Sequence, residues 1–245
     1  MKLGNFKSVL SLFGAVASFI LKHEQAPPSI PVVQPHTIKE YKLTKREIVL
    51  LMCLMTMCLT LRPTYVHPTQ VNNFSVFFDS EKHKAQAVIS YLDIVLGKEF
   101  NPEEPLAIKR NCEVGNIDSY FLLECDKKLG EFELLENGTS IEDFNGKVKI
   151  DFANEYLGGG ALEYGCVQEE IMFMCHPELL AAIMICPKME DDEAIGLLGF
   201  RKYFKVRGYK SSAEFDGPEN CKYNTREDGI LEEYIVAMDA TYRKN

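Results

Sequence analysis

The sequence DFANEYLGGG at residues 151–160 is followed, after seven residues, by QEE at residues 168–170. Polar and apolar residues alternate over residues 147–152, which predicts a strand near a sheet edge or mouth. The three consecutive glycines then predict a turn whose backbone conformations are closed to other residues. A helix is predicted over residues 167–175, and the unpaired N–H groups of a helix start suit an anion. We therefore predict a strand–glycine turn–helix unit.

Taken alone, this unit allows plain interpretations beside a functional one. A glycine-rich turn between a strand and a helix is common, and paired glutamates in a first helical turn most often complement the helix dipole on a solvated face. Neighbouring residues on a helix point roughly 100° apart. Glu169 and Glu170 therefore cannot act on one atom in the same way. One can act on a scissile oxygen while the other binds a neighbouring hydroxyl.

The rest of the chain predicts an α/β layer fold behind a helical beginning. Residues 26–36 hold four of the eleven prolines and indicate an extended connector. Helices are predicted over residues 9–20, over 48–61 after the capping-box pattern TKRE at 44–47, over 80–96 and over 178–186. Strands are predicted over residues 120–125, 132–135, 194–198 and 234–238. Strands that alternate with helices are typical of α/β folds.

Composition limits the classes of partner. The net charge of −9 over 245 residues argues against sequence-independent binding to nucleic acid, which needs a surplus of Lys and Arg. A polyanionic ligand would have to be held by local donors such as backbone N–H groups. The eight cysteines include no C-x-x-C pair, so zinc-ribbon and thioredoxin-type motifs are excluded. Several cysteines lie in apolar runs, which favours a reducing compartment, the nucleus or the cytoplasm.

The apolar run at residues 9–20 follows Lys2 and Lys7, and it can also be interpreted as a secretory signal. It offers no clean small-x-small cleavage site, and it is too short to span a bilayer. An amphipathic or buried helix is therefore the preferred interpretation. A secreted glycoprotein, with sequons at Asn73 and Asn137, stays as a remote alternative.

The combination of GGG, seven residues and QEE resembles the signature of the poly(ADP-ribose) glycohydrolase family. The likeness continues through residues 150–154, IMFMCHPELL at 171–180 and IVAMDATY at 235–242, and it is weaker over 44–61 and 71–96. The resemblance implies a macrodomain, a three-layer α/β/α sandwich that binds ADP-ribose, with a helical N-terminal accessory region. We expect the accessory region at residues 1–105 and an incomplete macrodomain-like catalytic part at residues 106–245.

The resemblance also implies an activity, because the family hydrolyses the ribose–ribose O-glycosidic bond of poly(ADP-ribose). It implies that Glu170 is the general acid and then the base toward water, while Glu169 and Asp151 bind and orient ribose hydroxyls. The other substrate-binding residues that it implies are Ile141, Glu142, Asn154, Gly158, Gly159, Gly160, Gln168 and Tyr203. It implies neither a metal nor a cofactor. The expected partners are poly(ADP-ribose), ADP-ribose and poly(ADP-ribosyl)ated proteins, with no direct nucleic-acid binding and no membrane.

Two departures from the family pattern leave a second function open. Val206 stands where the family has a tyrosine that clasps the ligand, so a stacking face and a hydroxyl are missing. The family's GNWGxGAFGGD loop around the diphosphate follows the strand that IVAMDATY matches, whereas this sequence contains no tryptophan and ends at Asn245. We therefore expect either an active glycohydrolase or a truncated, inactive family member that at most binds ADP-ribose.

Overall fold

The computed structural model describes residues 7–23, 32–36, 39–60, 73–79, 81–97, 100–112, 126, 128, 130–134, 136–144 and 148–240. Its centre is a five-stranded sheet in the order β1 (Lys39–Thr44), β2 (Pro105–Cys112), β4 (Glu193–Leu198), β7 (Tyr234–Asp239) and β3 (Val148–Ala153). β3 runs parallel to β7, and the other neighbouring strands are antiparallel. The strands predicted at residues 147–152, 194–198 and 234–238 are confirmed, and β3 lies at a sheet edge as expected.

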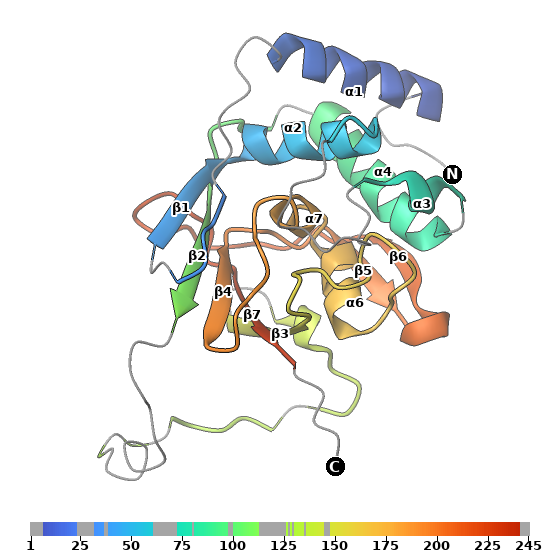
Figure 1. Ribbon diagram of the computed structural model, residues 1–245. Coiled ribbons are helices and arrows are strands. Elements are labelled where there is room, and N and C mark those ends of the chain that lie inside the picture. Colours follow the sequence, from blue (N-terminus) through green and yellow to red (C-terminus); the bar gives the residue numbers. More distant parts are fainter. Residues whose placement is uncertain are drawn as a thin grey trace.

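The helices pack on one another above this sheet (Figure 1). α1 (Val9–His23) contacts α2 (Lys45–Thr56) and α4 (Lys82–Gly97), and α2 contacts α7 (Leu179–Ala182). α6 (Gln168–Cys175) lies against β3 and against a hairpin of β5 (Phe204–Arg207) and β6 (Glu214–Pro218). The described part of the chain also contains the short helices α3 (Ser75–Asp79), η1 (Ile141–Asp143) and η2 (Lys210–Ser212). Helices packed on a mixed sheet confirm the predicted α/β class.

The start of α2 follows from its sequence. The Thr44 hydroxyl accepts a hydrogen bond from the Glu47 N–H at 3.3 Å, and the Glu47 carboxylate accepts one from the Thr44 N–H at 2.6 Å. This reciprocal pair is the predicted capping box, and it satisfies two N–H groups that the helix start leaves free. The helix ends at Thr56, earlier than the predicted end at residue 61.

One hydrophobic core joins both halves of the chain. It contains Leu12 of α1 and Met52 of α2 together with Phe173 of α6 and Ala237 of β7, each at most 1% exposed. β1 also comes from the first 105 residues and pairs with β2. The division at residue 105 stays a prediction, and both the core and the sheet extend across it.

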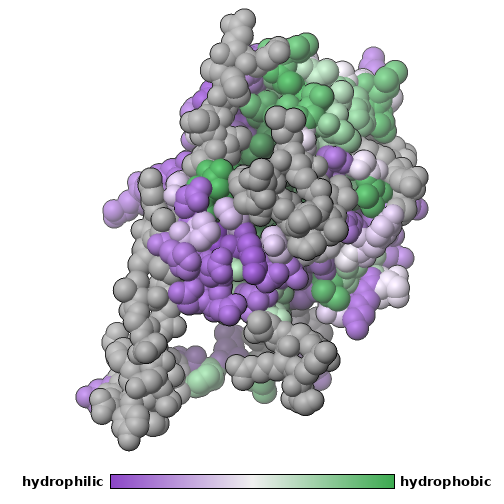
Figure 2. All heavy atoms as spheres, viewed as in Figure 1, coloured by the Kyte–Doolittle hydropathy of each residue, from purple (hydrophilic) through white to green (hydrophobic). Residues whose placement is uncertain are grey.

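The outer face of α1 is apolar. Leu10 and Leu21 are 83% and 66% exposed, and hydrophobic side chains gather at this end of the molecule in Figure 2. α1 nevertheless buries Leu12 and Val16 against α2 and α4, so the helix predicted over residues 9–20 is confirmed. No helix in the described ranges combines the length and the apolar character that crossing a bilayer requires.

β3 buries its polar face. Lys149 and Asp151 are at most 1% exposed, whereas Val148 and Phe152 are 61% and 58% exposed. The alternation in the sequence therefore predicts the strand but not the face that is buried. Because an uncompensated buried charge is costly, both polar side chains need partners inside the protein or in a ligand.

Several other predictions differ from the structure. Residues 132–134 form no strand, and Phe132 and Leu134 are 87% and 99% exposed. The prediction of a strand there is wrong, because β-propensity without a neighbouring strand to pair with does not make a ladder. The strand predicted over residues 120–125 lies outside the described residues. The helix predicted over residues 178–186 shortens to the single turn of α7, and β1, β2, β5 and β6 were not predicted.

Candidate active site

The glycine turn lets main chain and carboxylates approach each other closely. Gly158 and Gly159 have φ angles of 90° and 46°, which side chains with a Cβ rarely adopt. A Cβ on Gly159 would lie 2.6 Å from Glu169 Oε2 and 2.9 Å from Glu170 Oε1. A Cβ on Gly160 would lie 2.8 Å from the Cα of Gly165. The glycines are therefore needed for packing inside the protein as well as for any approach of a ligand.

Both glutamates of the QEE motif bind the backbone of this turn. Glu169 accepts hydrogen bonds from the Gly158 N–H at 2.5 Å and from the Asn154 N–H at 3.1 Å. Glu170 accepts them from the Gly160 N–H at 2.9 Å and from the Val167 N–H at 2.8 Å. The two carboxylates are thus held by different parts of the same loop, as their separation around the helix requires.

Asp151 completes a cluster of carboxyl groups. It is fully buried, and neither of its carboxyl oxygens has a hydrogen-bond partner among the described residues. Burial raises the pKa of Asp151 to about 7, and the charges of Glu170 and Glu142 act in the same direction. Burial also raises the pKa of Glu169 to about 9, with Asp151 adding to the shift and the Gly158 and Asn154 N–H groups opposing it. The raised pKa values of Asp151 and Glu169 favour their protonated forms near neutral pH.

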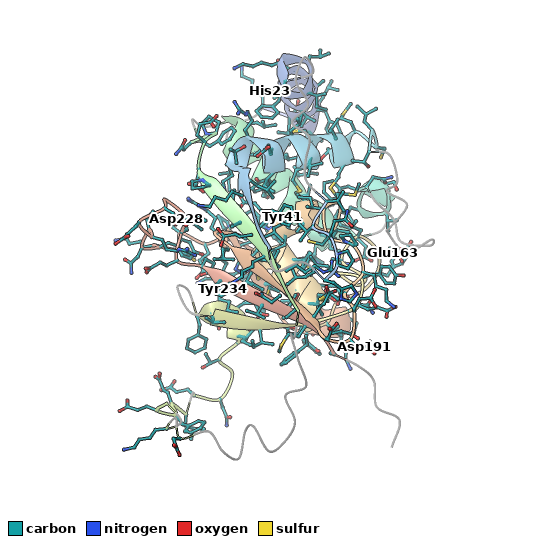
Figure 3. The ribbon with its side chains drawn as sticks, turned by 60° about the vertical axis from the view of Figure 1, so that its left-hand side comes forward. His23, Tyr41, Glu163, Asp191, Asp228 and Tyr234 are labelled. Carbon is teal, nitrogen blue, oxygen red and sulfur yellow. The ribbon has the colours of Figure 1, made fainter. Side chains whose placement is uncertain are left out.

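The cluster opens into a cavity of about 550 Å³, the first cavity, which is lined by Gly159, Gly160, Glu169, Glu170 and the end of β3. Among the described residues, five acidic side chains and no lysine, arginine or histidine line it; the five are Glu155, Glu163, Glu169, Glu170 and Asp239. Glu163 lies on the side of the molecule away from Asp228 (Figure 3). The first cavity therefore suits an uncharged, hydroxyl-rich group better than a phosphate.

A second cavity, of about 450 Å³, shares Phe152 with the first. Its walls come from η1, α6 and the β5–β6 hairpin, and they include Ile141, Ile171 and Val206. Its charged side chains are three acids and three bases: Glu142, Asp143, Asp216, Lys202, Lys205 and Arg207. The two cavities thus differ in charge although they flank the same strand.

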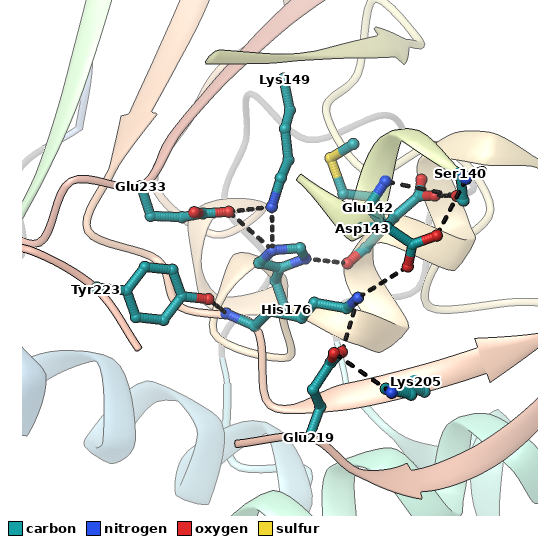
Figure 4. Close-up of polar contacts among 11 residues, drawn as sticks. Ser140, Glu142, Asp143, Lys149, His176, Lys205, Glu219, Tyr223 and Glu233 are labelled. Carbon is teal, nitrogen blue, oxygen red and sulfur yellow. Dashed lines mark hydrogen bonds and ion pairs between the residues drawn. The ribbon is translucent and has the colours of Figure 1, made fainter. Parts of the chain in front are cut away.

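Lys202 ties the walls of the second cavity together. Its side chain is 2% exposed, and its ammonium lies 3.4 Å from Asp143 Oδ1 and 2.7 Å from Glu219 Oε2 (Figure 4). Asp143 belongs to η1, whereas Glu219 directly follows β6, so one cation joins two distant segments. Burial raises the pKa of Glu142, which lines this cavity and receives a hydrogen bond from Ser140.

A second buried charge cluster lies beneath β3. The Lys149 ammonium binds Glu233, and the His176 Nε2 lies 3.3 Å from the same carboxylate (Figure 4). His176 caps the end of α6, and its Nδ1 lies 3.0 Å from the Met172 carbonyl oxygen. Burial lowers the pKa of His176 below its usual value. This cluster anchors α6 to the sheet, and it balances the buried charge of Lys149.

The helical region also supplies a residue to the glycine turn. Lys84 of α4 is 2% exposed, and its ammonium donates to the carbonyl oxygens of Gly160 at 2.9 Å and of Glu163 at 2.6 Å. Burial lowers the pKa of Lys84. No signal in the sequence around residue 84 separates this lysine from an exposed one.

The structure brings most of the predicted site residues together. Asn154, Gly159, Gly160, Glu169 and Glu170 line the first cavity, and Ile141, Glu142 and Gln168 line the second. Gly158 lies behind the turn, where a Cβ would meet Ile183. The side chain of Gln168 also binds the free edge of β3, donating to the Ile150 carbonyl at 3.1 Å and accepting from the Phe152 N–H at 2.9 Å.

Tyr203 lies apart from both cavities. Its hydroxyl donates to Glu178 at 2.6 Å and accepts from Lys45 at 3.0 Å, and its ring packs edge-on against Tyr91 at 5.1 Å between centroids. These contacts join α2, α4 and α7, so the geometry gives Tyr203 a structural role and does not support its prediction as a substrate-binding residue. No cluster of His, Cys, Asp or Glu that could hold a metal ion occurs in the part of the chain that the structure describes.

Comparison with known proteins shows sequence similarity to one family. The family model described as "Poly (ADP-ribose) glycohydrolase (PARG), Macro domain fold" matches residues 121–245, just over half of the chain. Poly(ADP-ribose) glycohydrolase 1 of Arabidopsis thaliana is 42% identical over 100 residues, which are 41% of this chain and 18% of that protein. Poly(ADP-ribose) glycohydrolase 1 of Caenorhabditis elegans is 37% identical over 123 residues, 47% of this chain and 16% of that protein.

A further relative, poly(ADP-ribose) glycohydrolase 2 of Caenorhabditis elegans, is 37% identical over 107 residues, 41% of this chain and 22% of that protein. The aligned segments thus span about a fifth of the length of these relatives. With its glycine turn, its paired glutamates and the extent of the family match, the chain belongs to the poly(ADP-ribose) glycohydrolase family.

Proposed function

We propose that this chain hydrolyses the ribose–ribose O-glycosidic bond of poly(ADP-ribose), with Glu170 as the acid and base. The observation that carries the proposal is the pair Glu169 and Glu170, held by N–H groups of a glycine turn at the wall of the first cavity, with the buried carboxyl of Asp151 close enough to interact with both. Glycosidases use carboxyl groups at the scissile bond because one of them can transfer a proton while others stabilise positive charge on the sugar.

The geometry supports an order of steps. The Glu170 carboxyl gives its proton to the oxygen of the leaving ribose as the glycosidic bond breaks, and the sugar carbon becomes positively charged. The ionised groups among the acidic side chains that line the first cavity stabilise this charge. Glu170 then takes a proton from the water that attacks the same carbon, which restores its starting form. Glu169, held by Gly158 and Asn154, orients a ribose hydroxyl.

The second cavity is proposed to take the nucleotide part of the same unit. Ile141, Ile171 and Val206 give it apolar walls for a base, and Lys202, Lys205 and Arg207 give it positive charge for phosphate. The shared wall at Phe152 lets one ligand reach both cavities. Poly(ADP-ribosyl)ated proteins would then be the macromolecular partners, in the nucleus or the cytoplasm. Six described cysteines are free thiols, as a reducing compartment allows.

Glu170→Gln tests the proposal. Glutamine keeps the shape of the side chain but cannot give a proton, so polymer cleavage by the purified chain should fall by a factor on the order of 10²–10⁴. Glu232→Gln, an exposed change outside both cavities, should cleave at the parent rate. Release of ADP-ribose from labelled polymer is the measurement, and cleavage by Glu170→Gln at near the parent rate would contradict the proposal.

A binding function without cleavage is the second candidate. Two observations favour it: Val206 offers no ring to stack on the ligand, and the N–H groups of Gly158 and Gly160 are already bound to the glutamates. Calorimetric titration with ADP-ribose separates the two functions. A chain that binds ADP-ribose, loses this binding in Asp151→Ala and leaves polymer intact would be a binding module.

A further inference from the structure

A third cavity, of about 580 Å³, lies on the other side of Val167 from the first. We call it the basic groove, and its defining residues are Lys82, His83, Lys84, Tyr164 and Lys210. The first three lie at the beginning of α4, Tyr164 lies in the loop before α6, and Lys210 begins η2. Two segments far apart in the sequence therefore gather basic side chains at one place, and a third adds the ring of Tyr164.

The charge of the basic groove is the reverse of that of the first cavity. Within the described ranges, three lysines and a histidine line it against one acidic side chain, Glu81, whereas five acidic side chains and no basic one line the first cavity. The chain as a whole has a net charge of −9, so a concentration of cations is unexpected from its composition. A local surplus of positive charge beside an acidic cavity attracts the charged part of a ligand whose neutral part enters that cavity.

Two of the cations are available to a ligand. Lys82 and Lys210 are exposed, and neither forms an ion pair within the described ranges. Lys84 differs, because its ammonium is bound to the Gly160 and Glu163 carbonyls. His83 accepts a hydrogen bond from the Phe215 N–H at 3.2 Å, which fixes its ring beside the groove.

The position of Lys210 is held by an unusual backbone. Its φ angle is 54°, a left-handed conformation that residues other than glycine rarely adopt and that the surrounding structure must enforce. The preceding turn is tight, because a Cβ on Gly208, whose φ angle is 81°, would collide with the Ser212 carbonyl. The ring of Tyr164, 65% exposed, adds a flat apolar surface to the same groove.

The groove continues the path of the first cavity. Val167 lines both, Glu163 lines the first cavity, and the next residue, Tyr164, lines the groove. Lys84 contributes to the wall of the groove while its ammonium holds Gly160, which lines the first cavity. A polymer that crosses the first cavity can therefore pass Val167 and reach the lysines.

We propose that the basic groove is a subsite for a second unit of the polyanion, the one next to the unit whose ribose lies in the first cavity. Lys82 and Lys210 bind its diphosphate, and the ring of Tyr164 stacks on its base or sugar. This inference rests on the proposed function. It makes the protein prefer long polymer over ADP-ribose alone, because a single unit cannot occupy both places.

The test is the double charge reversal Lys82→Glu/Lys210→Glu in the whole chain. Lys22→Glu/Lys222→Glu is its matched control, because it makes the same change of charge at exposed lysines outside the three cavities that form no ion pair within the described ranges. Binding of labelled long poly(ADP-ribose) should weaken roughly tenfold in the groove variant. The slope of log Kd against the logarithm of the salt concentration should also fall by about 1. Binding of ADP-ribose should stay at the parent value in both variants.

Long-polymer affinity equal to that of the control would overturn the inference, as would a parent chain that binds long polymer no more tightly than ADP-ribose. An equal loss of ADP-ribose binding would also overturn it, because the lysines would then serve the main site or the fold. Failure of the proposed function shows differently, as a parent chain that binds polymer without cleaving it. Thermal unfolding of both variants verifies that they are folded.

Discussion

The first and second cavities flank the same strand, but they are built in opposite ways. The first is made mainly by residues 152–170, with Asp239 and Ala240, and two of its acidic side chains, Glu169 and Glu170, are fixed by N–H groups of their own loop. The second is assembled from η1, α6 and the β5–β6 hairpin, and a buried lysine holds two of these pieces together. Under the proposed function, the catalytic residues are therefore positioned by neighbouring residues of the sequence, whereas the nucleotide-binding cavity depends on contacts between distant segments.

The sharpest way to break the first cavity alone is Gly159→Ala. The new Cβ would sit 2.6 Å from Glu169 Oε2 at a φ angle of 46°, so strain and collision add. We expect the free energy of unfolding to fall by about 3–4 kcal/mol and polymer cleavage to disappear. Urea denaturation measures the first and product release the second.

Gly217→Ala is the matched control for this change. Gly217 also has a positive φ angle, 99°, but a Cβ there would meet nothing within 4 Å. Only the strain of the positive φ angle remains, so the free energy of unfolding should fall by about 1–2 kcal/mol. Equal losses for the two variants would show that the glutamates do not press against the glycine turn.

The pH dependence of stability sharpens the comparison, because Asp151, the buried acid beside Glu169 and Glu170, has no hydrogen-bond partner among the described residues. With its pKa raised to about 7 from a usual value of 3.8, Asp151 keeps its proton in the folded state where the unfolded chain has released it. The folded state therefore binds more protons between these values, and stability falls as pH rises from about 4 to about 7. Above that window both states are ionised, and the loss stays at its full size.

Asp151→Asn removes this titration. Relative to the parent, the variant should gain stability on the order of 2–4 kcal/mol between pH 4 and pH 7, because each unit of pKa corresponds to about 1.4 kcal/mol. Urea denaturation at several pH values measures the difference. A difference between Asp151→Asn and the parent that does not change with pH would refute the expected linkage.

The second cavity should respond to Lys202→Met with a smaller loss of stability and a change in binding. Methionine fills the same space but releases Asp143 and Glu219, whose side chains are 54% and 20% exposed and so regain part of their hydration. We expect about 1–3 kcal/mol of destabilisation and roughly tenfold weaker ADP-ribose binding. Lys205→Met, which loses a 3.6 Å contact to the same Glu219 from a lysine 55% exposed, should cost less than 1 kcal/mol. Equal effects of the two changes would mean that Lys202 does not join the two walls.

Features that depend on neighbouring residues could be predicted from the sequence, and features that depend on distant segments could not. The capping box at Thr44, the edge strand β3 and the turn before Glu170 are all specified by neighbouring residues, and they were predicted. β1 and β2 were missed because their partners are distant, and because β2 carries charged residues such as the fully buried Arg110. That arginine is compensated only in the fold, by Glu193 at 2.5 Å and by the Val33 and Pro187 carbonyls.

The site divides in the same way. Asp151, Glu169 and Glu170 come together as the motif implied, since a strand, a turn and a helix of fixed length leave little freedom. Lys202 and Lys84 were missed, because a lysine far along the chain from its partners looks like an exposed one. Tyr203 was assigned to the ligand although its hydroxyl is bound within the core, and only the neighbouring helices show this.

The side chain of Gln168 explains why the motif begins with an amide and continues with two acids. On the free edge of β3 it acts as the missing residue of a neighbouring strand, giving one hydrogen to the Ile150 carbonyl and taking one from the Phe152 N–H. A carboxylate could only accept hydrogen bonds. Glutamate at this position would place a negative charge against the Ile150 carbonyl oxygen, and β3 would lose the hydrogen bonds that fix its distance from the start of α6. The Gln168 amide therefore holds the edge of β3 by hydrogen bonds to its backbone, as Glu169 and Glu170 hold the glycine turn.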